Sequence, residues 1–384
     1  TGNGMSKSAP TLPLYIHQLG IHNNNTIAQL SGLAFGITYI VSAIFSPIWG
    51  YAADKVGRKP MLLRASLGMS IVIFSIGFSP NVFVLVLLRA VQGAITGYST
   101  ACTTLIATQA DKGHAGYALG TLATANVAGS LIGPTFGGFI QDHVGSRPVF
   151  FITGSLMMVA FITTACFVKE NFVRAEVKQQ NLRDIWHSIP RKELTVILFV
   201  TTFVISLGLY TIEPIVTVYV SQLSRGSTHI ALIAGLVFSA SGFANILSAP
   251  LLGRLSDRTG SHRIILICLI AAGIIYIPQA FVHNPWQLMI LRFLLGLTMG
   301  GLSPSVNTMI KRITPDSLIG RVFGLSVSAG YLGVFGGSIM GGQIAAFLGI
   351  RSVFFITSAL LLFNGGWVYF KIYRKLKDTT SISR

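Results

Sequence analysis

The two halves of the chain repeat each other. The segment Arg147–Thr153, RPVFFIT, returns as Arg351–Thr357, RSVFFIT, which is a spacing of 204 residues, and Asp54 aligns with Asp257 at this spacing to within one residue. Hydrophobic residues make up 52% of the 384 residues and charged residues 10%. A membrane protein built from two parallel repeats is expected to hold its substrate between them, near the middle of the bilayer.

The apolar segments predict an all-α membrane protein. The mean hydropathy of +0.68 excludes an ordinary soluble domain. Eleven apolar runs of roughly 18 or more residues can each cross about 30 Å of hydrocarbon as a helix. The segment Thr1–Leu19 matches Ile205–Leu223 and implies a twelfth helix, which we expect to be truncated at its start. The eleven runs lie near residues 29–52, 60–78, 82–105, 115–140, 148–168, 194–220, 230–253, 263–282, 286–310, 322–347 and 352–372.

These twelve helices are predicted to form two pseudo-symmetric six-helix bundles. The first bundle covers residues 1–168 and the second covers residues 193–384. The polar stretch 169–192 between them is expected to be a cytoplasmic linker, part of which could lie on the membrane surface as an amphipathic helix.

The net charge of +17 follows from membrane topology. With a cytoplasmic amino terminus, 22 of the 28 Lys and Arg residues fall in inner loops or the tail, against Arg147, Arg225 and Arg351 in outer loops. This asymmetry is the positive-inside pattern and predicts that both termini are cytoplasmic. The asymmetry therefore argues against a nucleic-acid-binding surface as the cause of the positive charge. The 22 residues are Lys55, Arg58, Lys59, Arg64, Lys112, Lys169, Arg174, Lys178, Arg183, Arg191, Lys192, Arg254, Arg258, Arg263, Lys311, Arg312, Arg321, Lys371, Arg374, Lys375, Lys377 and Arg384.

No arrangement of residues predicts an enzyme or a cofactor site. The three Cys residues lie within apolar spans, and the eight His residues fall in loops or at span ends without metal-ligand spacing. A membrane enzyme would need a nucleophile with a base, or a metal cluster. We therefore expect a protein that is not an enzyme and has neither cofactor nor metal.

One loop motif occurs in both repeats. Residues 50–60 read GYAADKVGRKP and residues 253–263 read GRLSDRTGSHR. This Gly, Asp, Gly, Arg pattern resembles the signature loop of the major facilitator superfamily, and the resemblance covers the whole chain. It implies a conformational latch, because an acidic side chain there can pair with a helix amino terminus or a basic group in one state only. The gating residues expected here are Gly50, Asp54, Gly57, Arg58 and Asp257.

The fourth span carries an arginine. Arg89 lies in LVLLRAVQGAITG, residues 85–97, and returns as Arg292 in the tenth span. An intramembrane Arg is costly without a partner or a wet cavity. In proton-coupled members of the superfamily this fourth-span Arg is linked to proton transfer, so the resemblance implies that role for Arg89. A purely structural tie between helices is the alternative, and for Arg292 it is the preferred interpretation.

The fifth span contains repeated glycines. Residues 129–138 read GSLIGPTFGG, which allows close helix packing and places a bend at Pro134. The segment resembles the motif of antiporters in the superfamily, so Gly133 and Pro134 are also predicted to act in gating. The second repeat has Ser338 in place of the proline.

One carboxyl group lies deep inside a span. Glu213 interrupts the seventh span, where an ionised carboxylate is expensive, and this makes it a candidate proton carrier or cation contact. Asp54 is a further proton-coupling candidate. Lys7, in the first helix, aligns two residues before Glu213, so the two opposite charges are predicted to face each other across the cavity. A structural Glu213 and a Lys7 that snorkels to the interface are the alternatives.

The chain is similar to the twelve-span drug/proton antiporters of bacterial inner membranes. The resemblance implies a multi-pass, monomeric exporter that exchanges small organic molecules for protons by alternating access. A dedicated exporter of an anionic or zwitterionic metabolite, such as a carboxylate metallophore, is the alternative, and uptake symport is less favoured. The residues predicted to contact substrate are Asn3, Lys7, Thr11, Asn126, Tyr210 and Glu213.

Replacing Lys7 is expected to affect the binding of cationic and carboxylate substrates differently. For a cationic substrate, Lys7→Ala is expected to leave binding intact or improve it, because a like charge repels the ligand. For a carboxylate, the same change is expected to cost about 1–3 kcal/mol from a lost charge-assisted contact. Measured affinities for a cationic dye and a tricarboxylate decide between them. Indifference of both ligands would remove Lys7 from the cavity.

Overall fold

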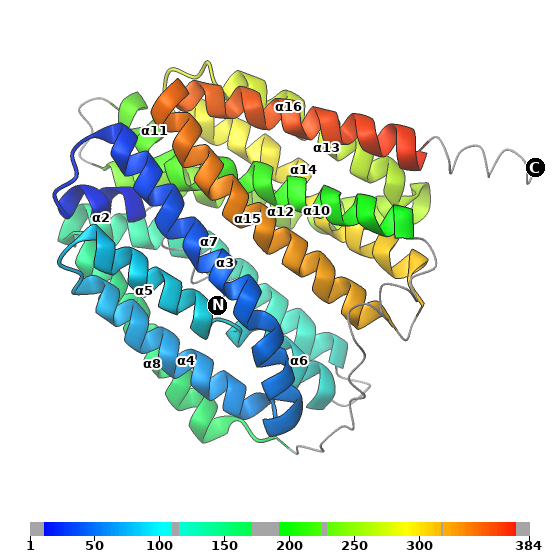
Figure 1. The fold of residues 1–384 in the computed structure, drawn as a ribbon, viewed down its shortest axis with the longest axis horizontal. Helices are drawn as coiled ribbons and strands as arrows, with labels where there is room; N and C mark the ends of the chain where they lie inside the picture. Colours follow the sequence, from blue (N-terminus) through cyan, green and yellow to red (C-terminus); the bar gives the residue numbers. More distant parts are fainter. Residues whose placement is uncertain (1–10, 110–114, 171–191, 225–228, 316–317, 374–384) are drawn as a thin grey trace, which may run out of the picture. The chain divides into compact units, whose positions relative to one another are not determined.

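The structure is a computed structural model that describes residues 11–109, 115–170, 192–224, 229–315 and 318–373. Within these ranges every regular element is a helix (Figure 1). The first repeat contains α2 (Leu12–Gln18), α3 (Asn24–Val56), α4 (Arg58–Gly77), α5 (Val82–Ile95), α6 (Tyr98–Gln109), α7 (Ala115–Val144) and α8 (Ser146–Phe167). The second contains α10 (Lys192–Ile212), η1 (Glu213–Ile215), α11 (Val216–Leu223), α12 (Ile230–Thr259), α13 (Ser261–Gln279), α14 (Pro285–Ile313), α15 (Ile319–Leu348), α16 (Ile350–Val368) and η3 (Tyr369–Tyr373).

The prediction of an all-α membrane fold with twelve helical segments is confirmed. Each predicted run coincides with one segment, and α2 supplies the described part of the first. Ten segments are long and apolar enough to cross a membrane, counted over the described residues alone. Two segments expected as single helices are broken: the fourth consists of α5 and α6, and the seventh of α10, η1 and α11.

The Arg64 side chain stabilises the break in the fourth span. Gly97, with φ at +126°, separates α5 from α6. The Arg64 guanidinium donates hydrogen bonds to the carbonyl oxygens of Ile95 (3.2 Å) and Thr96 (3.1 Å) and stacks 3.5 Å from the centre of the Trp49 ring. The carbonyl groups freed by the break therefore find a charged donor, as an apolar environment requires.

The break in the seventh span coincides with a proline. Pro214 has no backbone N–H and cannot continue the hydrogen-bond ladder of α10. The three residues Glu213–Ile215 form a single 3₁₀ turn before α11 resumes. All residues from Thr211 to Val220 are buried, so this break lies inside the protein.

The chain divides into two compact units. One comprises Thr1–Lys178 with Val216–Ser239, and the other comprises Gln179–Ile215 with Ala240–Arg384. In the first unit α4 packs against α8 and α3 against α5, and in the second α10 packs against α15 and α13 against α14 and α16. The division into bundles 1–168 and 193–384 stays a prediction.

The repeat is visible in individual hydrogen bonds. The side chains of Asn81 and Asn284 each accept a hydrogen bond of 2.9 Å from the backbone N–H of the residue three positions later in the chain. They cap α5 and α14 in the same way. The Ser70 hydroxyl of α4 donates to the Gly154 carbonyl of α8 at 2.8 Å. In the second repeat serine and glycine have exchanged helices: Ser358 of α16 donates to Gly273 of α13 at 2.7 Å.

Two equivalent glycines allow close helix contact. A Cβ on Gly93 of α5 would collide with the Thr38 carbonyl oxygen of α3, and a Cβ on Gly296 of α14 would collide with the Ser241 carbonyl oxygen of α12. The helix backbones therefore touch at corresponding points in both repeats, the form of association that small residues permit in membranes.

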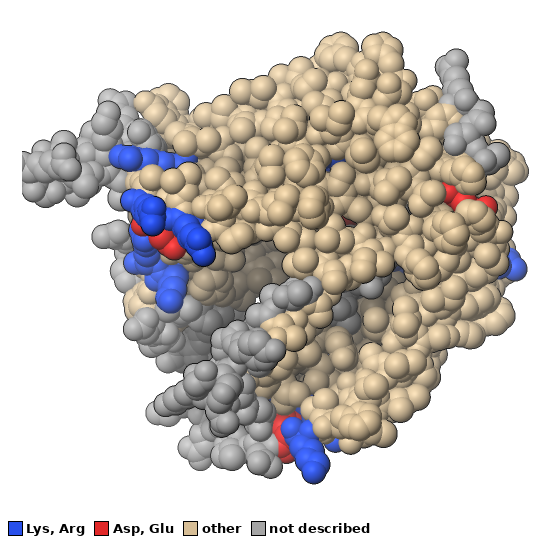
Figure 2. All heavy atoms as spheres, turned by 180° about the vertical axis from the view of Figure 1, so that it is seen from behind, with Lys and Arg blue, Asp and Glu red and all other residues tan. Residues whose placement is uncertain are grey.

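The surface suits a hydrocarbon environment. Phe83, Phe363 and Phe78 are 78%, 72% and 66% exposed. Figure 2 shows a face that is largely uncharged, with Lys, Arg, Asp and Glu gathered mostly near its margins. Exposed aromatic side chains of this size are costly in water and favourable against lipid.

The contact at Gly93 gives a stability prediction. Gly93→Ala is expected to destabilise the protein by about 1–3 kcal/mol, because the added methyl group overpacks the contact with α3. The measurement is the melting temperature in detergent. The matched control is Gly366→Ala in α16, where an added Cβ meets nothing within 4 Å. Equal melting temperatures for the two variants would contradict the packing argument.

Candidate functional site

Glu213 lies at the break in the seventh span. It is the first residue of η1 and is 9% exposed. The preceding helix α10 packs against α14, α15 and α16. The structure therefore places this carboxyl inside the protein, at a point where the backbone departs from helical geometry.

Arg292 and Tyr276 lie near Glu213. Arg292 of α14 interacts electrostatically with the Glu213 carboxylate and the Tyr276 hydroxyl. Tyr276 of α13 is fully buried, and its hydroxyl donates a hydrogen bond to the Gly208 carbonyl oxygen of α10 at 3.1 Å. The carboxyl group of Glu213, the guanidinium of Arg292 and the phenol of Tyr276 thus come from η1, α14 and α13. Sequence reasoning did not single out Tyr276.

Arg89 is buried to the same degree in the first repeat. It is 1% exposed, and its Nη1 donates to Oε1 of Gln92 one turn further along α5 at 3.4 Å. It also interacts electrostatically with Tyr39 of α3. The Nε and Nη2 atoms of Arg89 have no hydrogen-bond partner among the described residues, and the same holds for those of Arg292.

The predicted substrate residues are distributed over the two units. Thr11 is buried at the start of α2, and its carbonyl oxygen accepts a hydrogen bond from the Gln141 amide at 3.4 Å. Asn126 of α7 and Tyr210 of α10 are partly exposed. Asn3 and Lys7 lie outside the described residues, and so does the predicted contact between Lys7 and Glu213.

The signature loops have the same backbone geometry in both repeats. Gly57 between α3 and α4 and Gly260 between α12 and α13 both adopt φ of +99°, which is unfavourable for other residues. Gly50 and Asp257 are exposed. Asp54 belongs to α3, and its side chain lies outside the described part of the chain. The latch proposed for it remains a prediction.

Glu170 caps the helix that follows the first loop. Its two carboxylate oxygens accept hydrogen bonds from the backbone N–H groups of Arg58 (2.7 Å) and Lys59 (2.8 Å). The amino terminus of α4 is thereby satisfied from the end of the sixth span. Arg58 was predicted to be a gating residue, and this role stays a prediction; in the structure its backbone N–H is one donor of the cap.

The fifth-span motif packs against the first part of α12. A Cβ on Gly235 would collide with the carbonyl oxygen of Pro134, and a Cβ on Gly138 would collide with that of Ala231. One turn beyond Gly235 along α12, the Ser239 hydroxyl lies 2.8 Å from the Thr135 hydroxyl of α7. We call this contact between α7 and α12 the α7–α12 seam. Gly133 lies one residue before it, on α7.

A carboxylate closes one end of the α7–α12 seam. The Asp142 side chain accepts hydrogen bonds from the backbone N–H groups of Ala231 (3.0 Å) and Leu232 (2.8 Å), in the first turn of α12. A negative charge is favourable at this helix terminus. The adjacent His143 and His229 rings stack at 5.8 Å. This cap was not predicted from the sequence.

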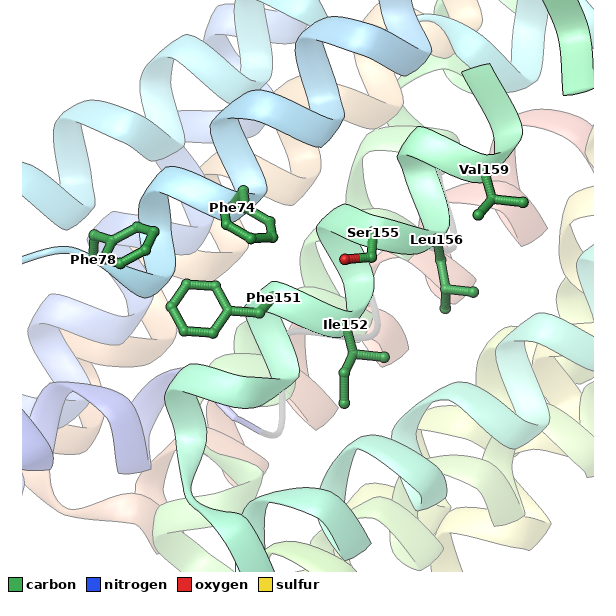
Figure 3. Close-up of a pocket in the computed structure, with 7 residues that line it drawn as sticks. All are labelled: Phe74, Phe78, Phe151, Ile152, Ser155, Leu156 and Val159. Carbon is green, nitrogen blue, oxygen red and sulfur yellow. The ribbon is translucent and has the colours of Figure 1, made fainter. Parts of the chain in front are cut away.

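One groove of about 420 Å³ has no features of a substrate site (Figure 3). It lies between α4 and α8, and the rings of Phe74 and Phe78 are 5.0 and 4.8 Å from that of Phe151. Ser155 is the one polar side chain in its lining. Because Phe78 and Leu156 are more than half exposed, the groove belongs to the lipid-facing surface. Among the described residues no group of three metal-ligating side chains occurs.

A family model and many curated proteins match this chain. The model described as Major Facilitator Superfamily matches residues 1–235 and 198–383. The multidrug resistance protein MdtG of Salmonella typhimurium is 42% identical over 376 residues, covering 98% of this chain and 93% of that protein. The MdtG proteins of Salmonella arizonae and Salmonella choleraesuis match over the same extent with the same identity.

Solved structures share the fold. The human organic anion transporter MFSD10 has a TM-score of 0.70 at 15% identity, covering 95% of both chains. A mutant of the nucleoside transporter NupG has a TM-score of 0.74 at 12% identity, covering 96% of this chain and 99% of that one. At these identities the likeness shows the fold alone.

The Asp142 cap gives a prediction about the α7–α12 seam. Asp142→Ala removes both cap hydrogen bonds and is expected to destabilise the closed seam by about 0.5–2 kcal/mol. Thr135→Cys with Ser239→Cys reports on the seam, because their hydroxyl groups are in contact. Disulfide formation between them should slow about twofold to thirtyfold.

The experiment uses a background in which Cys102, Cys166 and Cys268 are replaced by Ser. Glu193→Ala is the control, since Glu193 pairs with Lys371 at 3.5 Å on the exposed surface of the other unit. Such a pair contributes little. An unchanged cross-linking rate in Asp142→Ala would show that the cap does not hold the seam closed.

Proposed function

Because the chain belongs to the major facilitator superfamily and is a multi-pass membrane transporter rather than an enzyme, we propose that it exports small organic molecules across the cytoplasmic membrane in exchange for protons. The single observation that carries the proposal is a buried carboxyl, Glu213, at a helix break within a transporter whose 42% identical relatives are named multidrug resistance proteins. A group of this kind can take up a proton or a cation in turn.

The proposed orientation follows from the distribution of basic residues. With both termini in the cytoplasm of a bacterial cell, the inner loops hold the large excess of Lys and Arg. The carboxyl end of α7 and the amino end of α12 then lie on the outer side. The Asp142 cap and the α7–α12 seam would close the outer entrance, and the signature loops would act on the inner side.

Alternating access requires contacts that form in one state and break in the other. The Asp142 cap suits this because it consists of two hydrogen bonds from one side chain to one helix end. Asp54, Gly133 and Pro134 are proposed to act in the same cycle. Arg89 is proposed to assist proton transfer, and Lys7, Asn3, Thr11, Asn126 and Tyr210 to contact the substrate. The monomer is the proposed functional unit.

The proposal is tested in inside-out membrane vesicles. Acidifying the vesicle lumen should drive a fluorescent cationic dye into it, and a protonophore should abolish the uptake. Vesicles without the protein control for leakage. Dye movement that ignores the proton gradient would rule out proton-coupled export, and accumulation in the opposite direction would indicate uptake.

Glu213 is expected to be essential for coupling. Glu213→Gln keeps the shape of the side chain but cannot carry a proton, so gradient-driven transport should fall about tenfold or more. The protein should remain folded, with elution and melting behaviour close to the wild type. Glu193→Gln, at the start of α10 in the same span, is the matched control and should retain transport. Normal gradient-driven transport by Glu213→Gln would assign coupling to another group.

A further inference from the structure

The end of α5, at the break in the fourth span, is capped by side chains of two other helices. A helix leaves its last four carbonyl oxygens without a backbone partner. The Trp49 indole N–H of α3 donates a hydrogen bond of 2.6 Å to the Ala94 carbonyl oxygen. The Arg64 guanidinium of α4 binds the carbonyl oxygens of Ile95 and Thr96 through Nη2 and lies over the Trp49 ring. We call these two side chains the Arg64–Trp49 cap.

The capped carbonyl groups have a second set of possible partners. In a continuous α-helix each carbonyl oxygen accepts a hydrogen bond from the backbone N–H four residues later. For residues 94–96 those donors would be residues 98–100, which form the first turn of α6. A broken span and a straight span therefore both satisfy these groups, as hydrocarbon requires, but with different donors. The segment can adopt two discrete arrangements.

Gly97 is the residue whose backbone distinguishes the two arrangements. Its φ is +126° in the structure, whereas φ in an α-helix is about −63°. Glycine populates both signs of φ at little cost. The atom nearest to a Cβ at Gly97 would be Nη2 of Arg64 at 3.6 Å, an ordinary van der Waals distance. The need for glycine here comes from the backbone angle and not from a lack of space.

The second repeat lacks the capping side chains, and its equivalent span is unbroken. At the spacing of 203 residues that aligns the signature loops, Leu252 stands in place of Trp49 and Ile267 in place of Arg64. Neither replacement can donate a hydrogen bond from its side chain. The glycine is kept as Gly300, yet α14 is one continuous helix through this point. The break therefore accompanies the donors and does not follow from the glycine alone.

The two parts of the fourth span are attached to the first unit in different ways. The backbone of α5 touches α3, because a Cβ on Gly93 would collide with the Thr38 carbonyl oxygen. In α6 the buried residues Ala101 and Leu105 pack against Leu62 of α4. Packed apolar side chains can slide past one another, whereas a backbone contact joins helices that move together. The part that can move is therefore α6.

We propose that the fourth span is a hinge on Gly97, and that Arg64 and Trp49 are positioning residues that stabilise its bent state. The proposal rests on the function proposed above, because alternating access requires segments with two stable arrangements. When the span straightens, its carbonyl oxygens pass to backbone donors and Arg64 loses two acceptors. The Nε and Nη1 atoms of Arg64 have no hydrogen-bond partner among the described residues even in the bent state. The guanidinium therefore carries donors for water or another acceptor after the change.

The test measures distances between pairs of spin labels on the purified full-length protein, in a background without the native cysteines. Thr103→Cys on α6 is paired with Ile44→Cys on α3 or with Ile162→Cys on α8, all at exposed positions of the same unit. Both pairs should show a main separation and a second, minor one that grows in Asp142→Ala. The control pair Ile44–Ile162 does not include α6 and should show one separation throughout.

Two kinds of variant should reduce the bent component in the same way. Gly97→Ala keeps the Arg64–Trp49 cap but disfavours the positive φ, and should lower the ratio of bent to straight about tenfold. Trp49→Leu with Arg64→Ile carries the residues of the second repeat and should lower it about tenfold or more, because three carbonyl oxygens lose their donors. Both should lead to the same second separation. Gly366→Ala and Arg351→Gln, at positions with room or exposure, should leave the ratio unchanged.

A break that is only structural would give a different result. One separation for each pair, the same in the wild type, in Asp142→Ala and in every variant, would overturn the proposal. If the variant without the Arg64–Trp49 cap fails to fold, Gly97→Ala gives the answer, because it removes no hydrogen-bond donor. If Gly97→Ala also fails to fold and the wild type shows one separation, the break is a fixed part of the fold and the proposal is wrong.

The hinge and the proposed function fail separately. The distances are measured without substrate and without a proton gradient, so two separations that respond to Gly97→Ala support the hinge even if vesicles show no proton-driven export. Conversely, normal gradient-driven export by Gly97→Ala, with one unchanged separation, would retain the proposed function and remove the hinge from it.

Discussion

A peptide group that crosses hydrocarbon must find its hydrogen-bond partner within the protein. Continuous helices meet this requirement by themselves, and each interruption of a helix needs a substitute. At the break in the fourth span the substitute is the Arg64 guanidinium, which binds two carbonyl oxygens. At the break in the seventh span it is a 3₁₀ turn around Pro214. A charged or ionisable side chain is therefore found at each of these two breaks, Arg64 at the first and Glu213 at the second.

The same requirement explains the two carboxylates that cap helices of other spans. Glu170 binds the first turn of α4, and Asp142 binds the first turn of α12. A helix that begins with free N–H groups carries a partial positive charge there, and a carboxylate compensates it. These caps are reversible contacts between elements distant in sequence. A transporter that changes conformation can break them at moderate cost, whereas the glycine contacts at Gly93 and Gly296 are suited to joining helices that move together.

Much of the fold could be predicted from the sequence because length and hydropathy determine membrane spans, and because two sequence repeats are expected to share the arrangement of their helices. The cap residues Asn81 and Asn284 stand at equivalent positions and have the same role. The helix breaks were harder to foresee, since the backbone at Gly97 depends on a side chain 33 residues earlier, that of Arg64. The Asp142 cap depends on a helix that begins 88 residues later in the chain. Patterns within one segment carry no information on such contacts.

The site was predictable in part for the same reason. Glu213 stood out as a carboxyl inside an apolar span, and its burial agrees with that reading. The repeat suggested a structural role for Arg292, and that role stays a prediction. Equivalent positions in two repeats share their backbone geometry, as Gly93 and Gly296 do, but their side chains face partners that diverge independently. In the first repeat the neighbour of the arginine is an amide, and in the second it is a carboxylate. A duplicated fold thus supplies two similar buried cations whose electrostatic neighbours differ.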